Sequence, residues 1–304
     1  MGVKMALHSI PSIRHRFIEA GGVRVFYRES LPETGEKAPT ILLLHGFPAS
    51  SHQFRRLMDA LGSQYRLIAP DYPGFGHSEA PASTNENGTF TYSFDSLATV
   101  IEAFVDALSL KRFMLYAFDF GAPVGFRLAS RRPELIAGLI VQNGNAYLEG
   151  LSDIARDFIA LAPSDDGAVE QVRNLLTLDM TRGQYEGGTA QPELVAPDGW
   201  TMDQHFLDRP DRRQPQLDLA FDYKSNLVRY PEWQQWLRQS QPPTLIAWGR
   251  NDPFFTEAGA RAFLADVPEA ELHLFDTGHF ALEECLPVIA PLIADFVERK
   301  WPRG

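Results

Sequence analysis

Tyr116-Ala117-Phe118-Asp119-Phe120-Gly121 is the stretch that decides the fold of this 304-residue chain. It ends an apolar run that starts at Phe113 and predicts a buried strand, and a helical pattern follows over residues 122–131. A carboxylate, Asp119, therefore stands at a sharp turn between a strand and a helix. Small residues occupy positions 117 and 121, where the two backbones must approach each other closely.

This turn has the spacing of a nucleophile elbow, written G-x-S-x-G in serine hydrolases, with aspartate in place of serine. Gly121 satisfies the second glycine position, and Ala117 stands at the first, where the fit is tighter. A carboxylate at the centre predicts an alkyl-enzyme ester as the covalent intermediate, rather than an acyl-enzyme.

Strand and helix patterns alternate on both sides of this turn. Extended runs at 14–20 and 23–30 flank Gly21-Gly22 and predict a β-hairpin. Further strands are predicted at 40–44, 65–70, 135–141, 244–248 and 271–275, and helices from Ser50 or Ser51 to about 61, over 94–108 and over 282–299. This alternation predicts an α/β fold with a mostly parallel sheet covered by helices on both faces.

Residues 144–240 break the alternation. The stretch is rich in Asp, Arg, Gln, Pro and Trp and has helical fragments without a convincing strand. Ligands enter open α/β sheets at the carboxyl ends of the strands. We therefore predict a helical cap at 144–240 over a core domain formed by 1–143 and 241–304, with a solvated decoration without function as the alternative.

Two more titratable residues follow predicted strands. Asp252 comes after the strand at 244–248, and His279, within Thr277-Gly278-His279, comes after the strand at 271–275. Alone, an Asp before a helix more often caps it and a Gly-His pair more often forms a turn. Together with Asp119 they have the order nucleophile, acid, histidine that α/β-hydrolases show, so they predict a catalytic triad.

His45-Gly46-Phe47-Pro48 is the fourth element of the candidate site. It follows the buried strand at 40–44 and can aim the backbone N–H of Phe47 into the site, with the N–H of Phe120 as a second donor. Two such donors form an oxyanion hole, in which each contributes about 3 kcal/mol to transition-state stabilisation. His45 is interpreted as stabilising the turn rather than as a second base.

With these motifs the chain resembles the α/β-hydrolase superfamily, in particular its aspartate-nucleophile branch of epoxide hydrolases and haloalkane dehalogenases. The resemblance covers the chain outside the cap and includes the loop Asp71-Tyr72-Pro73-Gly74-Phe75-Gly76-His77-Ser78. It implies an eight-stranded α/β-hydrolase fold with an inserted helical cap. It also implies that Asp119 forms the ester and that His279, supported by Asp252, deprotonates the water that cleaves it, with no metal and no organic cofactor.

The leaving group stays open between the two families. The resemblance to dehalogenases implies Trp after the nucleophile and Asn after His-Gly. Here Phe120 and Phe47 stand there, and neither side chain can donate a hydrogen bond. Three cap tryptophans, Trp200, Trp233 and Trp236, keep a halide site open.

Epoxide hydrolases use cap tyrosines to protonate the opening ring oxygen. The resemblance implies Tyr223 as this acid, with packing of the cap on the core as its alternative role. A second tyrosine has no match at the family spacing, and Tyr147 and Tyr185 are possible substitutes. The side chains expected to line an apolar substrate pocket are His45, Pro48, Tyr147, Tyr185, Phe254 and Phe280.

The amino-acid composition limits the kinds of partner that the protein is expected to bind. The net charge is −11 and no Lys/Arg block stands out, which argues against nucleic acid and anionic membranes. The single cysteine, Cys285, excludes an intramolecular disulfide. Met1–Ile10 lacks the apolar core of a signal peptide, and no run approaches the roughly 18 apolar residues of a membrane span.

The sequence therefore predicts a cytoplasmic monomer or homodimer that acts on a small, apolar, uncharged substrate with water. The favoured reaction is hydrolysis of an epoxide to a diol. Hydrolytic release of halide from a haloalkane is the alternative, and a non-catalytic small-molecule receptor with a hydrolase fold is the alternative from another class.

Overall fold

One sheet of eight strands organises the protein, of which the computed structural model describes residues 10–302. The order in the sheet is β1-β2-β4-β3-β5-β6-β7-β8. The strands are β1 (Ile13–Ala20), β2 (Val23–Ser30), β3 (Thr40–Leu44), β4 (Arg66–Pro70), β5 (Phe113–Phe118), β6 (Ile136–Gln142), β7 (Thr244–Gly249) and β8 (Glu271–Phe275). The β1–β2 and β2–β4 pairs are antiparallel and every later pair is parallel, which confirms the predicted mostly parallel sheet.

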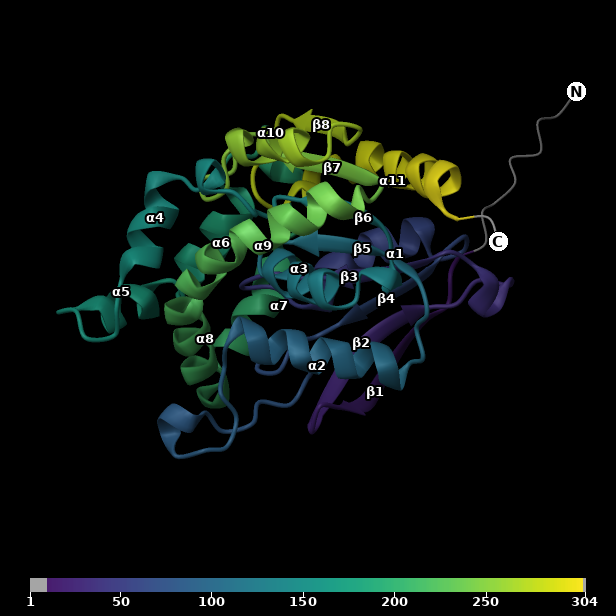
Figure 1. Cartoon of the computed structure of the whole chain (residues 1–304). Coiled ribbons are helices and arrows are strands. Elements are labelled where there is room, and N and C mark those ends of the chain that lie inside the picture. Colours follow the sequence, from purple (N-terminus) through teal and green to yellow (C-terminus); the bar gives the residue numbers. More distant parts are fainter. Residues whose placement is uncertain (1–9, 303–304) are drawn as a thin grey trace, which may run out of the picture.

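Helices cover both faces of this sheet (Figure 1). The core helices are α1 (Arg55–Leu61), α2 (Phe94–Ala107), α3 (Gly121–Arg131), α10 (Glu257–Asp266) and α11 (Ala281–Lys300). Apolar side chains of α1 and α11 share one buried cluster, and those of α2, α3 and α10 share another. The expected helix start at Ser50 or Ser51 is a 3-10 turn, Ser51–Phe54, that leads into α1.

The central strands supply both clusters at once. In β3, Ile41 and Leu43 pack on the face of α1 and α11, while Leu42 and Leu44 pack on the face of α2 and α3. This division follows from the twofold side-chain period of a strand. It explains why the strand sequence is apolar throughout rather than alternating, as expected for a parallel sheet buried on both faces.

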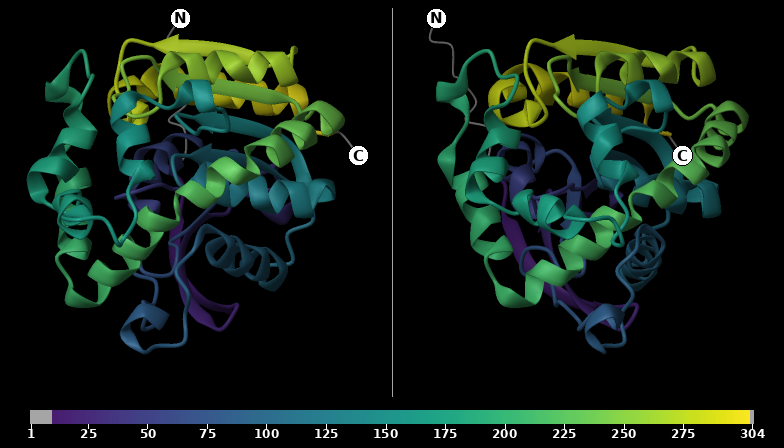
Figure 2. Two further views of the ribbon diagram at one scale, coloured as in Figure 1. Left: turned by 60° about the vertical axis from the view of Figure 1, so that its left-hand side comes forward. Right: turned by 90° about the vertical axis from the view of Figure 1, so that its left-hand side faces the viewer.

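Six helices lie between β6 and β7. They are α4 (Asp153–Ala160), α5 (Ala168–Asn174), α6 (Leu178–Glu186), α7 (Pro197–Leu207), α8 (Pro210–Asp222) and α9 (Lys224–Ser240). Helices α4 to α8 gather beyond one end of the sheet, and α9 returns along α3 (Figures 1 and 2). Among the described residues, 144–240 contain no strand of the sheet, only an isolated bridge from Leu151 to Phe255.

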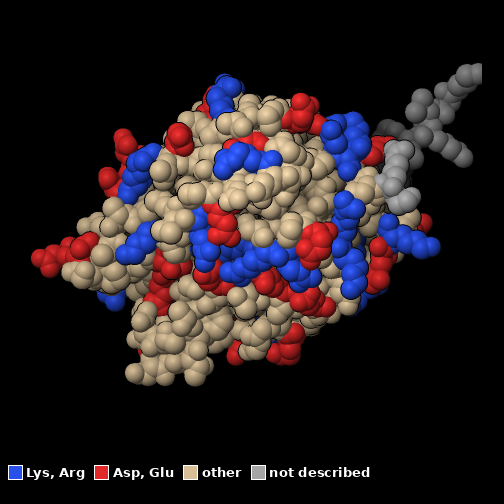
Figure 3. Space-filling model, viewed as in Figure 1, with Lys and Arg blue, Asp and Glu red and all other residues tan. Residues whose placement is uncertain are grey.

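Charged side chains of both signs mix on the face shown in Figure 3. Arg131 of α3 pairs with Asp95 and Glu102 of α2, and the buried Arg127 also pairs with Asp95. No described helix is long and apolar enough to cross a membrane. The segment Met1–Ile10, on which the signal-peptide argument depends, falls almost wholly outside the described residues.

Candidate active site

Asp119 occupies the predicted turn between β5 and α3 in a left-handed backbone conformation, with φ of +46°. Residues other than glycine rarely adopt this conformation, and backbone strain of this kind concentrates at functional sites. The turn needs small neighbours, because a Cβ atom on Gly121 would lie 2.2 Å from the carbonyl oxygen of Leu44. A Cβ on Gly46 would lie 2.3 Å from Asp119 Oδ1, so both glycines keep the space that the carboxylate occupies.

Two backbone amides hold the Asp119 carboxylate. The N–H of Phe47 donates to Oδ1 at 2.6 Å, and the N–H of Phe120 also hydrogen-bonds to the carboxylate. Burial raises the pKa of Asp119 to about 6, against the opposing effect of His279 and of these two amides. The amides predicted for an oxyanion hole therefore both face the side chain that would carry the ester.

His279 lies between the two aspartates. Its Nδ1 is 2.6 Å from Oδ2 of Asp252, and its Nε2 is 3.8 Å from Oδ2 of Asp119. Burial lowers the pKa of His279, but the charge and hydrogen bond of Asp252, aided by Asp119, outweigh it and raise the pKa overall. The three residues that the sequence placed after separate strands thus lie side by side at one end of the sheet.

Asp252 is held in place by donors on both oxygens. Its Oδ1 accepts hydrogen bonds from the N–H groups of Phe254 and Phe255, at 2.8 and 3.1 Å. Its Oδ2 accepts one from the side-chain amide of Asn143 at 2.8 Å, in addition to the contact with His279. These contacts fix the position of the Asp252 carboxylate beside His279.

Asn143 was not identified in the sequence. It follows β6 directly, has φ of +43°, and links β6 to β7 through two hydrogen bonds with the backbone of Gly249. Its own carbonyl accepts from the N–H of Asp119 at 3.3 Å. Its position just after a parallel strand next to β5 is the signal that could have identified it.

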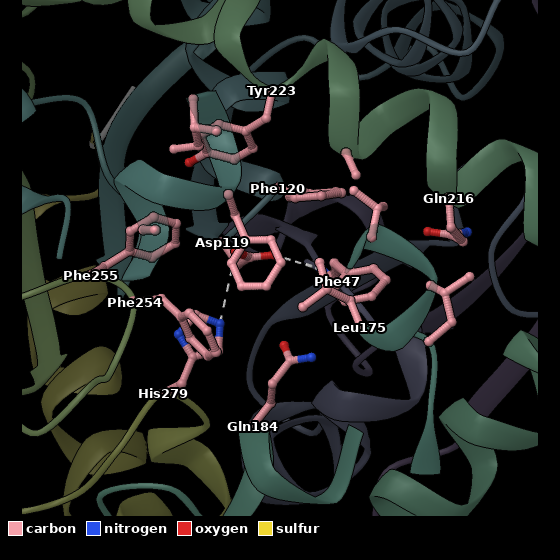
Figure 4. A pocket seen from close by; sticks show the side chains of 16 residues that line it. Phe47, Asp119, Phe120, Leu175, Gln184, Gln216, Tyr223, Phe254, Phe255 and His279 are labelled. Atoms are coloured by element: carbon pink, nitrogen blue, oxygen red, sulfur yellow. Dashed lines mark hydrogen bonds and ion pairs between the residues drawn. The ribbon is translucent and has the colours of Figure 1, made fainter. Parts of the chain in front are cut away.

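A cavity opens in front of Asp119 and His279 (Figure 4). It holds about 830 Å³ of space free of protein atoms, the part open to solvent included. Its wall is formed by Phe47, Asp119, Phe120, Ala155, Phe158, Ile159, Val172, Leu175, Leu176, Gln184, Gln216, Ala220, Tyr223, Phe254, Phe255 and His279. Eleven of these sixteen side chains are apolar, so the cavity favours an uncharged ligand.

Three polar side chains of the cap enter this cavity. Tyr223, at the end of α8, has its hydroxyl in a hydrogen bond with Tyr230, and burial keeps the pKa of Tyr223 well above its ordinary value. Gln184 of α6 and Gln216 of α8 also line the wall. Neither glutamine was singled out in the sequence, because a glutamine on a cap helix gives no signal that separates it from a solvent-facing one.

Most of the expected pocket residues lie elsewhere, which corrects the prediction. Of the six, only Phe254 lines the cavity. The hydroxyl of Tyr147 donates to Asp266 at 2.8 Å, and that of Tyr185 donates to Asp203 at 2.6 Å, so both tyrosines are held away from Asp119. Phe280 stacks on Tyr185 with ring centroids 3.8 Å apart.

His45 and Pro48 complete the correction. Both are buried in the turn that carries Phe47, and neither is part of the cavity wall. The Nε2 atom of His45 accepts a hydrogen bond from the N–H of Tyr72 at 3.2 Å. Burial lowers the pKa of His45 to about 4, so the ring is neutral and serves the turn.

The cap tryptophans do not line the cavity. Trp233 and Trp236 are buried, and neither indole N–H has a hydrogen-bond partner among the described residues. Trp200 lies against Arg182. Within residues 10–302, no group of three or more His, Cys, Asp or Glu side chains could hold a metal ion.

Comparison with known proteins gives one family. The model of the alpha/beta hydrolase fold matches residues 39–285. An uncharacterized hydrolase of Saccharomyces cerevisiae, YNR064C, is 42% identical over 296 residues, which are 93% of this chain and 97% of the yeast protein.

Solved structures agree on the fold. The epoxide hydrolase CorEH superposes with a TM-score of 0.77 at 18% identity, covering 95% of this chain and 99% of its own. A variant of the haloalkane dehalogenase DatA from Agrobacterium tumefaciens superposes with a TM-score of 0.76 at 22% identity, covering 94% of this chain and 97% of its own. At these identities the likeness concerns the fold alone.

Proposed function

The chain belongs to the alpha/beta hydrolase family, and on that premise we propose that it hydrolyses its substrate through an ester on Asp119, most favourably an epoxide to a diol. The observation that carries this proposal is the triad geometry. The Asp119 carboxylate faces the cavity, two backbone amides hold it, and His279 stands behind it on Asp252.

In the first step, an oxygen of Asp119 attacks a ring carbon of the epoxide and the C–O bond of the ring breaks. The departing oxygen takes the hydroxyl proton of Tyr223. To donate this proton, the Tyr223 hydroxyl turns from the Tyr230 oxygen toward the substrate. Because an alkoxide is a poor leaving group, this proton is what favours ring opening. The raised pKa keeps Tyr223 protonated at neutral pH, so the donor is present when the substrate binds.

In the second step, His279 takes a proton from a water, and the hydroxide attacks the ester carbonyl of Asp119. The distance of 3.8 Å between His279 Nε2 and Asp119 Oδ2 leaves no direct hydrogen bond to compete with that water. The amides of Phe47 and Phe120 stabilise the oxyanion. Collapse breaks the ester, the product oxygen takes the proton from His279, and the diol leaves. Asp119, left as the carboxylic acid, gives up its proton and Tyr223 regains one, by exchange with water, which restores the enzyme.

Hydrolysis of a haloalkane is the second candidate, and the observation that favours it is Gln184. Its side chain enters the cavity and makes no hydrogen bond to another described residue, so its N–H groups are free to hold a departing halide. The three cap tryptophans, which left a halide site open in the sequence, do not line the wall.

A single turnover in oxygen-18 water tests the ester route. With enzyme in excess over styrene oxide, the first diol should be unlabelled, because its new oxygen comes from Asp119, and the label should appear in the Asp119 peptide. Label in the first diol would overturn the ester. Halide release from chlorinated and brominated alkanes, measured beside diol formation, decides between the two leaving groups.

A further inference from the structure

Gln216 carries a buried acceptor that the protein leaves unused. The residue is 3% exposed and lines the cavity, yet its Oε1 atom has no hydrogen-bond partner among the described residues. A buried polar atom without a partner destabilises the fold unless something else satisfies it. The neighbouring side chains of the wall are mostly apolar and offer no donor. Because Gln216 lines the cavity, a ligand bound there can supply the missing hydrogen bond.

The orientation of this amide is set by the core. The Nε2 group of Gln216 donates to the carbonyl oxygen of Gly74 at 3.1 Å. Turning the amide over would place two oxygens against each other, so the carbonyl end is the one left for the cavity. Gly74 is itself held, with φ of +82° and its N–H donating to the carbonyl of Glu79.

Gln216 lies far from the reacting end of the cavity. Figure 4 shows it across the cavity from His279, beyond Phe47 and Phe120. Gln216, Ala220 and Tyr223 follow one another along one face of α8 and all line the wall. Seven residues separate the first from the last, so their Cα atoms lie about 10 Å apart along the helix.

We propose that Gln216 is a specificity-determining residue that accepts a hydrogen bond from a hydroxyl or N–H at the far end of an elongated, uncharged substrate. The inference rests on the proposed function for the reacting end of that substrate. The apolar wall between the two ends binds the intervening hydrocarbon, and it excludes an ammonium group because no carboxylate other than Asp119 lines the cavity.

The test uses a matched pair of epoxides, 7,8-epoxyoctan-1-ol and its methyl ether. The hydroxyl can donate to Oε1 and the ether cannot, while the reacting ring is the same. In the wild type, kcat/KM should be at least about tenfold higher for the alcohol. In Gln216→Met, which keeps the side-chain length, the ratio should fall to about one.

Gln214→Met is the matched control. Gln214 lies on the same helix and hydrogen-bonds to Asp218, but it is not part of the cavity wall, so the wild-type ratio should persist. Equal rates for the two epoxides in the wild type would overturn the proposal, as would a ratio that survives Gln216→Met.

Two further measurements keep the test decisive. If Gln216→Met does not fold, the wild type is tested instead with a four-carbon pair, 3,4-epoxybutan-1-ol and its methyl ether. These chains are too short to reach Gln216, so the wild type should show no preference for the alcohol over the ether. If neither these epoxides nor styrene oxide is turned over, epoxide hydrolysis fails as the proposed function. Calorimetric binding of octan-1-ol against 1-methoxyoctane then still shows whether an alcohol is preferred and whether Gln216→Met removes that preference.

Discussion

The Nε2 atom of His279 lies 3.8 Å from Oδ2 of Asp119, so each group shifts the pKa of the other. The Asp119 charge helps to raise the pKa of His279, and a charged His279 opposes the rise in the pKa of Asp119. An ester at Asp119 removes that negative charge. In the proposed mechanism the pKa of His279 should then fall, so that the imidazole can act as the base that activates water.

Asp119→Asn should abolish turnover. The amide keeps the size of the side chain but is not a nucleophile, so kcat should fall by at least about 10⁴-fold, as is typical when a covalent nucleophile is removed. Steady-state diol formation measures this, and a thermal melt close to that of the wild type shows that the fold is kept. Residual activity within tenfold of the wild type would assign the attack to another group.

His279→Gln should trap the ester. Attack by Asp119 needs no base, whereas cleavage of the ester does, so the intermediate should accumulate. Intact-protein mass spectrometry after mixing with styrene oxide should show one added substrate mass. The double variant Asp119→Ala/His279→Gln is the control, and an adduct in it would place the bond elsewhere.

The two chemical steps should depend differently on pH. Asp119 must be ionised to attack, and with a pKa of about 6 the rate of ester formation should fall as the pH drops below that value. Removal of the positive charge in His279→Gln should move this fall to higher pH, because His279 holds the pKa of Asp119 down. Burst-phase rates from pH 4.5 to 9 for both proteins measure the shift, and a shift to lower pH would contradict the coupling.

Tyr223→Phe should separate the two leaving groups. Loss of the hydroxyl proton should reduce epoxide hydrolysis by about 10²-fold or more, which is the usual contribution of a general acid. A halide needs no proton, so its release from a haloalkane should change little. Tyr147→Phe, whose hydroxyl is bound to Asp266 outside the cavity, is the control that should leave both rates unchanged.

Asn143→Ala should reduce both stability and activity. The change leaves the buried N–H of Gly249 without its acceptor and removes one of the donors to the Gly249 carbonyl and to Asp252, which should lower the free energy of unfolding by about 2–4 kcal/mol. Urea denaturation measures this loss. Asn174→Ala, at an exposed position of α5, should leave the unfolding midpoint in place.

The core could be predicted closely because its signals are local. The apolar runs at 40–44 and 113–118 are strands with those same bounds, since short buried runs between turn residues have few other solutions. The predicted strand at 271–275, which is only partly buried, also has the expected bounds. The residues at the carboxyl ends of β5, β7 and β8 come together because parallel strands end at one edge of the sheet.

The cavity wall could not be predicted in the same way. The cap helices meet the core at angles that no periodic pattern encodes, so Tyr147 and Tyr185 were expected near Asp119 but point to carboxylates of their own. Gln184 and Gln216 reach the cavity only through the packing of α6 and α8. Which polar atoms a substrate meets is therefore a property of the tertiary structure.

The cap leaves the sheet after β6 and rejoins it at β7, and these two strands are neighbours, with Val141 paired to Ile246. Because the two strands are parallel, the chain leaves at the carboxyl end of β6 and returns at the amino end of β7, where Thr244 pairs with Leu139. Helix α9, which runs along α3, carries the chain back to that end. Helices α4 to α8 come before that return, so their insertion, loss or exchange would leave the hydrogen bonds between β6 and β7 in place. Proteins with this fold can therefore change the substrate that they accept while the catalytic residues stay the same.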